Sequence, residues 1–125
     1  MKAVDEHRGA AGPTQVEKPW GFENRWATTD HYLGKVLHIN AGEALSLQYH
    51  RRKDESILVI HGAMDLDLED DDGAIERHRM VPGDTRRILP GRQHRMTAVD
   101  DCDVFEVSTP DPDDVVRLED RYGRR

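Results

Sequence analysis

Several residue types are scarce in this sequence, and each scarcity excludes a class of protein. The 125 residues contain one cysteine, Cys102, so a framework of internal disulfides is excluded and a reducing compartment is favoured. No apolar run approaches membrane-spanning length, and the first residues lack the apolar stretch of a signal peptide. Basic residues form no long block and the net charge is −7, which argues against nucleic acid as a partner. We therefore expect a cytoplasmic protein without membrane or nucleic-acid partners.

Length and composition indicate one small domain. Hydrophobic residues make up 36% of the chain and charged residues 34%, so we expect a thin core beneath a charged surface. Residues 1–15 are polar, contain glycine and proline, and show no periodicity, which predicts a flexible N-terminal arm. Residues 16–125 form the predicted domain.

Alternating apolar and polar residues after position 32 predict a series of strands. The clearest run is 63–70, where Met64, Leu66 and Leu68 alternate with acidic residues, so that one face is buried and the other exposed. Glycine, aspartate and proline separate the runs. We expect strands within 32–40, 43–50, 56–62, 63–70, 74–81, 85–90, 94–99 and 103–110. Short strands at this spacing predict an all-β sandwich or barrel.

Four polar side chains are predicted to converge on a metal site. Gln48 and His50 are two residues apart, so on a strand both leave by the same face. The polar residues 51–54 predict a turn that brings Glu55 back beside them, and a second turn before His94 supplies a fourth donor. Two imidazoles, a carboxylate and an amide oxygen suit a divalent metal ion.

The stretches around these residues resemble the two sequence motifs of cupins. Gln48 stands where the first motif usually has its first histidine. In the second motif, Leu89 stands at the proline position and Ala98 at the asparagine position. The matching residues are Gly42, His50, Glu55 and Gly62 in the first motif and Gly83, Gly91 and His94 in the second.

Four segments resemble, more narrowly, the small cupin domain of type II mannose-6-phosphate isomerases. They are VEKPWG (16–21), LSLQYH (45–50), PGRQHR (90–95) and VVRLEDRYGR (115–124). The resemblance implies a single-domain cupin double-stranded β-helix, or jelly-roll barrel. It also implies a metal-dependent aldose–ketose isomerase for a sugar phosphate similar to mannose 6-phosphate. Zinc is the metal that it favours, although the donors also suit iron, manganese, cobalt and nickel.

Three residues are candidates for holding an anionic substrate or moving a proton. Lys35 precedes the first motif on a predicted strand, and its charge suits a phosphate. His38, on the same strand, either lines the cavity or has a structural role. Arg95 is carried over from the histidine–arginine pair of the isomerases, although a neighbour of His94 points to the opposite face unless the strand bulges. Lys53 stands where that family usually has arginine, and a metal-bound water is a further candidate base.

Other functions fit the same sequence. A metal-dependent cupin of another class, such as a dioxygenase, a lyase or a specialised-pathway enzyme, would use similar ligands, and a non-catalytic module that binds a sugar or anion would use the same fold. Guanylyl transfer is not expected of this sequence, because it contains no glycine-rich nucleotide loop.

A homodimer is expected from the barrel and from the aromatic residues. Trp20, Phe22 and Trp26 lie close together in a chain with only 6% aromatic residues, which predicts a packing anchor in the core or at a subunit contact. Small barrels leave apolar faces and an edge that dimerisation commonly covers. We expect Trp20 and the N-terminal strand to lie near the interface.

Overall fold

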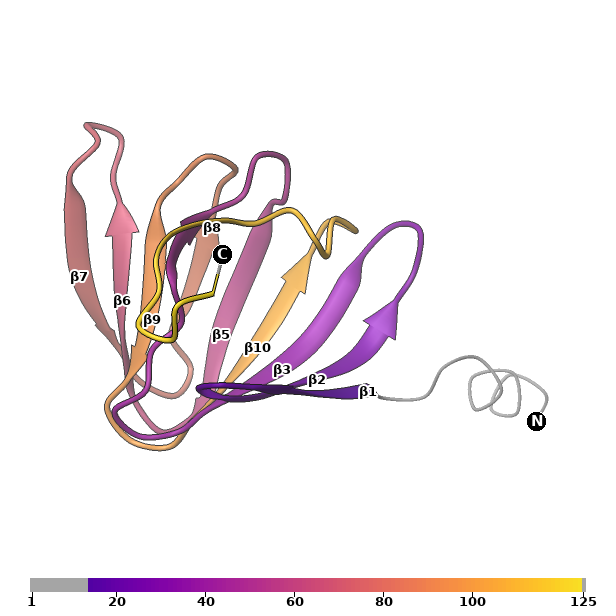
Figure 1. Cartoon of the computed structure of the whole chain (residues 1–125), viewed down its shortest axis with the longest axis horizontal. Coiled ribbons are helices and arrows are strands. Elements are labelled where there is room, and N and C mark those ends of the chain that lie inside the picture. Colours follow the sequence, from indigo (N-terminus) through magenta and orange to yellow (C-terminus); the bar gives the residue numbers. More distant parts are fainter. Residues whose placement is uncertain (1–13, 125) are drawn as a thin grey trace.

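The computed structural model describes residues 14–124, which form eleven strands and no helix (Figure 1). The prediction of an all-β protein is therefore confirmed. Thr14 and Gln15, which belong to the predicted arm, begin the first strand, and the rest of that arm lies outside the described residues. Within residues 14–124 there is no helix that could cross a membrane.

Two antiparallel sheets make up the fold. The first has the order β1-β2-β3-β10-β5-β8, and its strands are β1 (Thr14–Lys18), β2 (Gly21–Thr28), β3 (Leu33–Ile39), β10 (Cys102–Ser108), β5 (Glu55–His61) and β8 (Thr85–Ile88). The second has the order β11-β4-β9-β6-β7, and its strands are β11 (Val116–Glu119), β4 (Leu47–Tyr49), β9 (His94–Ala98), β6 (Met64–Glu69) and β7 (Ile75–Met80). After β10 the chain crosses from the first sheet to the second (Figure 1). There β11 pairs with β4.

The core lies between the sheets and follows the alternation of the sequence. Met64 and Leu66 are fully buried on β6, as predicted, and they pack with Leu37 and Ile39 of β3. Burying such side chains is the main favourable term in folding a domain of this size. The buried cluster comprises Trp20, Leu37, Ile39, Ile57, Val59, Met64, Leu66, Met80, Ile88, Met96, Ala98, Cys102 and Val104.

The two tryptophans near the N-terminus lie in different environments, one buried and one exposed. Trp20 is only 2% exposed and belongs to the core, which confirms the predicted packing anchor for this residue. Trp26 is 49% exposed and meets the edge of the Phe105 ring, with the ring centroids 6.4 Å apart. The predicted homodimer remains a prediction, which sedimentation of the purified protein would test.

The motif glycines lie at turns where a side chain would be strained. Gly62, which follows β5, has a φ of +76°, a conformation that residues with a Cβ rarely adopt. A Cβ at this position would lie 2.1 Å from the carbonyl oxygen of Asp101. Gly62 therefore permits the close approach of two chain segments that brings β5 and β10 into register.

Candidate metal centre

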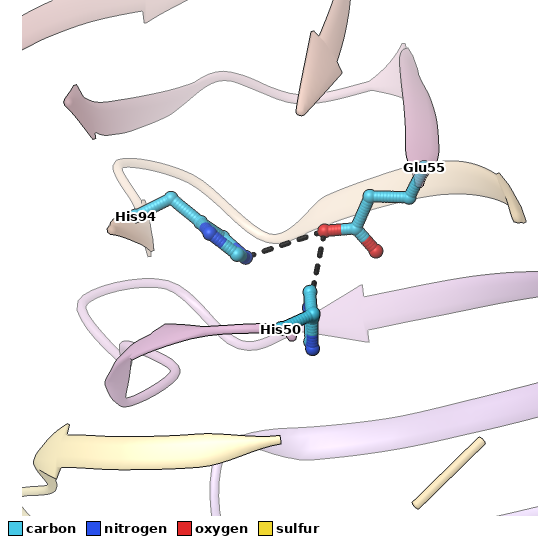
Figure 2. Close-up of side chains that lie close together, drawn as sticks. All are labelled: His50, Glu55 and His94. Atoms are coloured by element: carbon cyan, nitrogen blue, oxygen red, sulfur yellow. Dashed lines mark ion pairs between the residues drawn. The ribbon is translucent and has the colours of Figure 1, made fainter. Parts of the chain in front are cut away.

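His50, Glu55 and His94 meet between the two sheets. His50 follows β4, Glu55 begins β5 and His94 begins β9, so three strand ends supply the three side chains (Figure 2). Oε1 of Glu55 lies 3.2 Å from Nε2 of His94 and 3.5 Å from Nε2 of His50. All three residues are buried, and their ligand atoms lie within 4.8 Å of one another. In the described part of the chain, no other group of histidine, cysteine and acidic residues has this spacing.

The hydrogen bonds of the two imidazoles determine which nitrogen faces the centre. Nδ1 of His50 lies 2.5 Å from the carbonyl oxygen of Asp114, and Nδ1 of His94 lies 2.9 Å from that of Arg92. A carbonyl oxygen only accepts hydrogen bonds, so each Nδ1 carries the proton and each Nε2 presents a lone pair. Both Nε2 atoms are buried without a hydrogen-bond partner. Two lone pairs aimed at a carboxylate oxygen repel it unless a cation lies between them, and the donor set therefore fits a divalent metal ion.

Glu55 is held in its charged form. Burial opposes ionisation and raises its pKa, but the Lys53 ammonium, together with the two imidazoles whenever they carry a second proton, outweighs burial, so the pKa of Glu55 stays well below its usual value. An ionised carboxylate is the form that binds a metal ion. The centre is therefore ready to bind metal at neutral pH without losing a proton from Glu55.

Lys53 is a component of the site that the sequence analysis did not assign to it. Its Nζ lies 3.2 Å from Oε2 of Glu55 and 2.8 Å from Oε2 of Glu106, and the side chain is 5% exposed. Burial lowers the pKa of Lys53, but the two carboxylates more than compensate and raise it, so the ammonium is kept. The spacing offered a signal, because Lys53 and Glu55 are two residues apart and share a face if the strand begins early.

A cavity of about 380 Å³ adjoins the donor set. His50, Gln48 and Lys53 form part of its lining, whereas Glu55 and His94 do not. Six cationic side chains line it against three acidic ones, although the whole chain carries a net charge of −7. The charged residues of the lining are Lys18, Arg25, Lys35, Lys53, Arg117, Arg124, Glu23, Glu106 and Asp113. This excess of positive charge favours an anionic ligand.

Lys35 lies on this cavity wall, as its predicted role requires. Its Nζ is 3.5 Å from Oε1 of Glu23 and 3.6 Å from Oε2 of Glu106. Burial raises the pKa of Glu23, but Lys35 and Arg25 outweigh burial and lower it. The inner faces of β2, β3 and β10 thus carry a row of alternating charges beside the core.

Comparison with known proteins identifies the family. The family model described as mannose-6-phosphate isomerase C-terminal matches residues 5–120. The chain belongs to this family. Mannose-1-phosphate guanylyltransferase of Escherichia coli (strain K12) is 30% identical over 114 residues, and that of Salmonella typhimurium is 29% identical. Each alignment covers 88% of this chain but 23% of the relative, so the chain spans about a quarter of the length of these curated relatives.

Solved structures show the same fold at lower identity. KdgF from Halomonas sp. is 22% identical, with a TM-score of 0.68 over 82% of this chain and 90% of that one. Oxalate decarboxylase from Bacillus subtilis is 15% identical, with a TM-score of 0.75 over 85% of this chain and 30% of that one. These likenesses confirm the cupin fold that the two motifs predicted for this member of the isomerase C-terminal family.

Gln48 lies beside the donor set of this family member. It pairs with His94 across β4 and β9, and its side chain reaches the cavity wall. Its Oε1 accepts a hydrogen bond of 2.6 Å from the hydroxyl of Ser46, which is buried. The alternative interpretation is that Gln48 supports His50 by a hydrogen bond. In the structure, Nδ1 of His50 is hydrogen-bonded to the carbonyl oxygen of Asp114 instead. Coordination of a metal ion by Gln48 remains a prediction.

The structure does not bring His38 and Arg95 to the cavity. His38 stacks on Phe22 with ring centroids 4.9 Å apart, and its Nδ1 lies 2.6 Å from Asp103, on the opposite face of β3 from Lys35. Arg95 follows the inward-facing His94 on β9, so it points outward and donates to Glu119. Successive side chains of a strand point to opposite faces, which explains why His38 and Arg95 both face away from the cavity. For Arg95, the neighbour of His94, the sequence already indicated this difficulty.

Asp114 connects the C-terminal segment to the metal centre. Its carboxylate accepts hydrogen bonds from the backbone amides of Arg51, Arg52 and Lys53 at 3.0, 2.7 and 3.0 Å. Its carbonyl oxygen binds His50. One residue therefore fixes both the turn between β4 and β5 and the orientation of the His50 ring.

We predict that Asp114→Asn removes a pH-dependent part of the stability. Burial raises the pKa of Asp114, but the three amides and Arg52 outweigh burial and lower it to about 2 from an ordinary 3.8. A lowered pKa stabilises the fold above the unfolded value of 3.8, and this contribution is lost as the pH falls towards 2. Chemical denaturation should show the variant about 1–2 kcal/mol less stable at pH 7, with the difference shrinking below pH 4. A difference that stays constant from pH 7 to pH 2.5 would contradict this role.

Proposed function

We propose that this chain is a metal-dependent cupin enzyme that interconverts the aldose and ketose forms of a sugar phosphate, with mannose 6-phosphate as the first substrate to test. The observation that carries the proposal is that the buried donor set adjoins a cationic cavity, because His50 and Lys53 both form part of the cavity lining. The family membership supports the same reaction class. The guanylyltransferase relatives are about four times longer than the matched segment, so their names alone do not assign a reaction to it.

His50, Glu55 and His94 are the residues that would hold the ion, with Gln48 as a further donor. A bound divalent ion supplies Lewis acidity that polarises the carbonyl and hydroxyl oxygens of the sugar. Nitrogen and oxygen donors of this kind suit zinc, the predicted metal, as well as manganese, iron, cobalt and nickel. The protonated Nδ1 atoms of His50 and His94 stay on backbone carbonyls and keep both rings oriented during turnover.

The cavity wall supplies groups for binding and proton transfer. Isomerisation moves one proton between adjacent carbons and another between adjacent oxygens. Glu106 is a carboxylate on this wall, joined to the donor set through Lys53, and Lys35 contacts the same oxygen of Glu106. We assign proton transfer at carbon to Glu106 and retain Lys35 as its partner. The remaining cations of the wall, including Arg25 and Lys18, would bind the phosphate.

The test is turnover of mannose 6-phosphate by protein loaded separately with each of the five metals. Proton NMR should show fructose 6-phosphate accumulating, and unphosphorylated mannose should react at least about tenfold more slowly, because it lacks the charge that the cavity attracts. Oxygen uptake measured on the same samples should be absent.

Two outcomes would redirect the proposal. Oxygen consumption with a small organic acid or sugar would indicate a dioxygenase. Tight binding of a sugar phosphate without conversion under every metal loading would indicate a binding module instead of an enzyme.

A further inference from the structure

Lys53 stands between the metal ligand Glu55 and the wall residue Glu106. Its Nζ lies 3.2 Å from one carboxylate and 2.8 Å from the other, and the three side chains are 5%, 1% and 5% exposed. Lysine is among the residues least often buried, because removing an ammonium from water is costly unless its partners compensate. A buried ion pair adds little net stability compared with apolar residues of similar volume. The position of this lysine therefore calls for a reason other than stability.

The turn itself does not require a buried lysine. Asp114 binds the backbone amides of Arg51, Arg52 and Lys53 alike, so the three residues have the same role in the backbone. The side chains of Arg51 and Arg52 are exposed, and only the third side chain of this run enters the protein. Alternation along the chain places the side chain at position 53 on the same face as Glu55, but nothing in the turn requires that side chain to be a lysine.

The charges around the donor set show what Lys53 changes. The imidazoles of His50 and His94 are neutral in the tautomer that their hydrogen bonds specify, whereas Glu55 and Glu106 are acidic. With a divalent ion present, these groups without Lys53 would be electrically neutral. With Lys53 they carry one positive charge, next to a cavity that is already cationic.

We propose that Lys53 is a fixed counter-cation of the metal centre, a positioning residue that holds Oε2 of Glu55 and keeps the loaded centre positive towards an anionic ligand. The inference rests on the proposed function only in that the donor set binds a divalent ion. Oε1 of Glu55 faces both imidazoles while Oε2 is held by Lys53, so the carboxylate offers one oxygen to the ion. The same ammonium repels the ion, so Lys53 lowers the affinity for metal in exchange for a stronger pull on anions.

Removing a residue that merely supports a metal ligand weakens metal binding, whereas removing Lys53 is expected to strengthen it. Lys53→Met should bind Co²⁺ at least about tenfold more tightly than the wild type, because a repelling charge is gone and two buried carboxylates need a cation. The metal-free variant should melt at a lower temperature for the same reason. Inorganic phosphate should bind the Co²⁺-loaded variant at least about tenfold more weakly.

Calorimetric titration with Co²⁺, and then with phosphate, measures these quantities, and the visible spectrum of Co²⁺ reports the coordination. Lys53→Arg should stay close to the wild type because it keeps the charge. Lys35→Met is the matched control, since Lys35 contacts Glu106 and Glu23 and has no contact with Glu55 within 4.0 Å. Its effect on Co²⁺ affinity should be clearly smaller.

A double variant keeps the test informative if Lys53→Met does not fold. Lys53→Met combined with Glu106→Gln removes one positive and one negative charge, so Co²⁺ affinity should return towards the wild-type value. Weaker or unchanged Co²⁺ binding in a folded Lys53→Met protein would overturn the inference and leave Lys53 as a support for Glu55. Absence of Co²⁺ binding in the wild type would instead overturn the metal centre, and the inference with it.

Discussion

Replacing His94 by alanine is expected to lower the affinity for divalent metal by about a hundredfold or more and to abolish turnover of mannose 6-phosphate. His94 is 2% exposed and its Nε2 lies 3.2 Å from Oε1 of Glu55, so the change removes one of three donors from a buried centre. The loss should exceed the effect of altering a residue that only orients a ligand, which is typically about 10–100-fold. Metal content after dialysis and Co²⁺ titration measure the affinity.

His78→Ala is the control for this experiment. His78 lies on β7, next to Glu76 and Arg86, and it has no contact with the donor set. This variant should retain metal and turnover. Gln48→Ala, measured in parallel, shows whether the amide is a fourth ligand, because a ligand role predicts a clear loss of affinity. Full metal retention by a folded His94→Ala protein would contradict the proposed centre.

The second large effect is expected on stability. Glu106→Ala should lower the free energy of unfolding of the metal-free protein by about 3 kcal/mol, because it leaves the buried Lys53 ammonium with Glu55 alone. Glu106 is 4% exposed and contacts Lys53 at 2.8 Å and Lys35 at 3.6 Å. Urea denaturation of metal-free protein gives the value directly.

An exposed ion pair in the same region provides the comparison. Asp54 and Arg87 are 2.6 Å apart, but their side chains are 31% and 63% exposed. Asp54→Ala should therefore lower the free energy of unfolding by less than about 1 kcal/mol. If both substitutions lowered the free energy of unfolding by the same amount, burial would not explain the contribution of the Glu106 ion pair.

The fold and the grouping of His50, Glu55 and His94 could be predicted from the sequence, because both depend on residue spacing within short segments. Strands with one buried face repeat every two residues, so Met64 and Leu66 could be assigned to the core from their spacing. The short turn before Glu55 and the glycines of the motifs likewise limit how the chain can return. His50, Glu55 and His94 could be grouped because one short turn joins β4 to β5 and another joins β8, the pairing partner of β5, to β9.

The remaining features depend on contacts between distant segments. His38 and Arg95 have suitable chemistry, but the pleat of their strands turns them away from the cavity. Nothing near Asp114 in the sequence indicates that its carboxylate closes a turn more than sixty residues earlier. The buried charges of Glu23 and Glu106 were also difficult to predict, because an acidic residue on a strand ordinarily indicates the exposed face.

The crossing of the C-terminal segment between the sheets affects how the protein can be made. His50 is oriented by a carbonyl at position 114, and Arg124 lines the cavity, so the site is incomplete until these residues have left the ribosome. A nascent chain that exposes only His50 and Glu55 would hold a metal ion poorly. An ion bound at the proposed centre would therefore be loaded late, after synthesis of this segment.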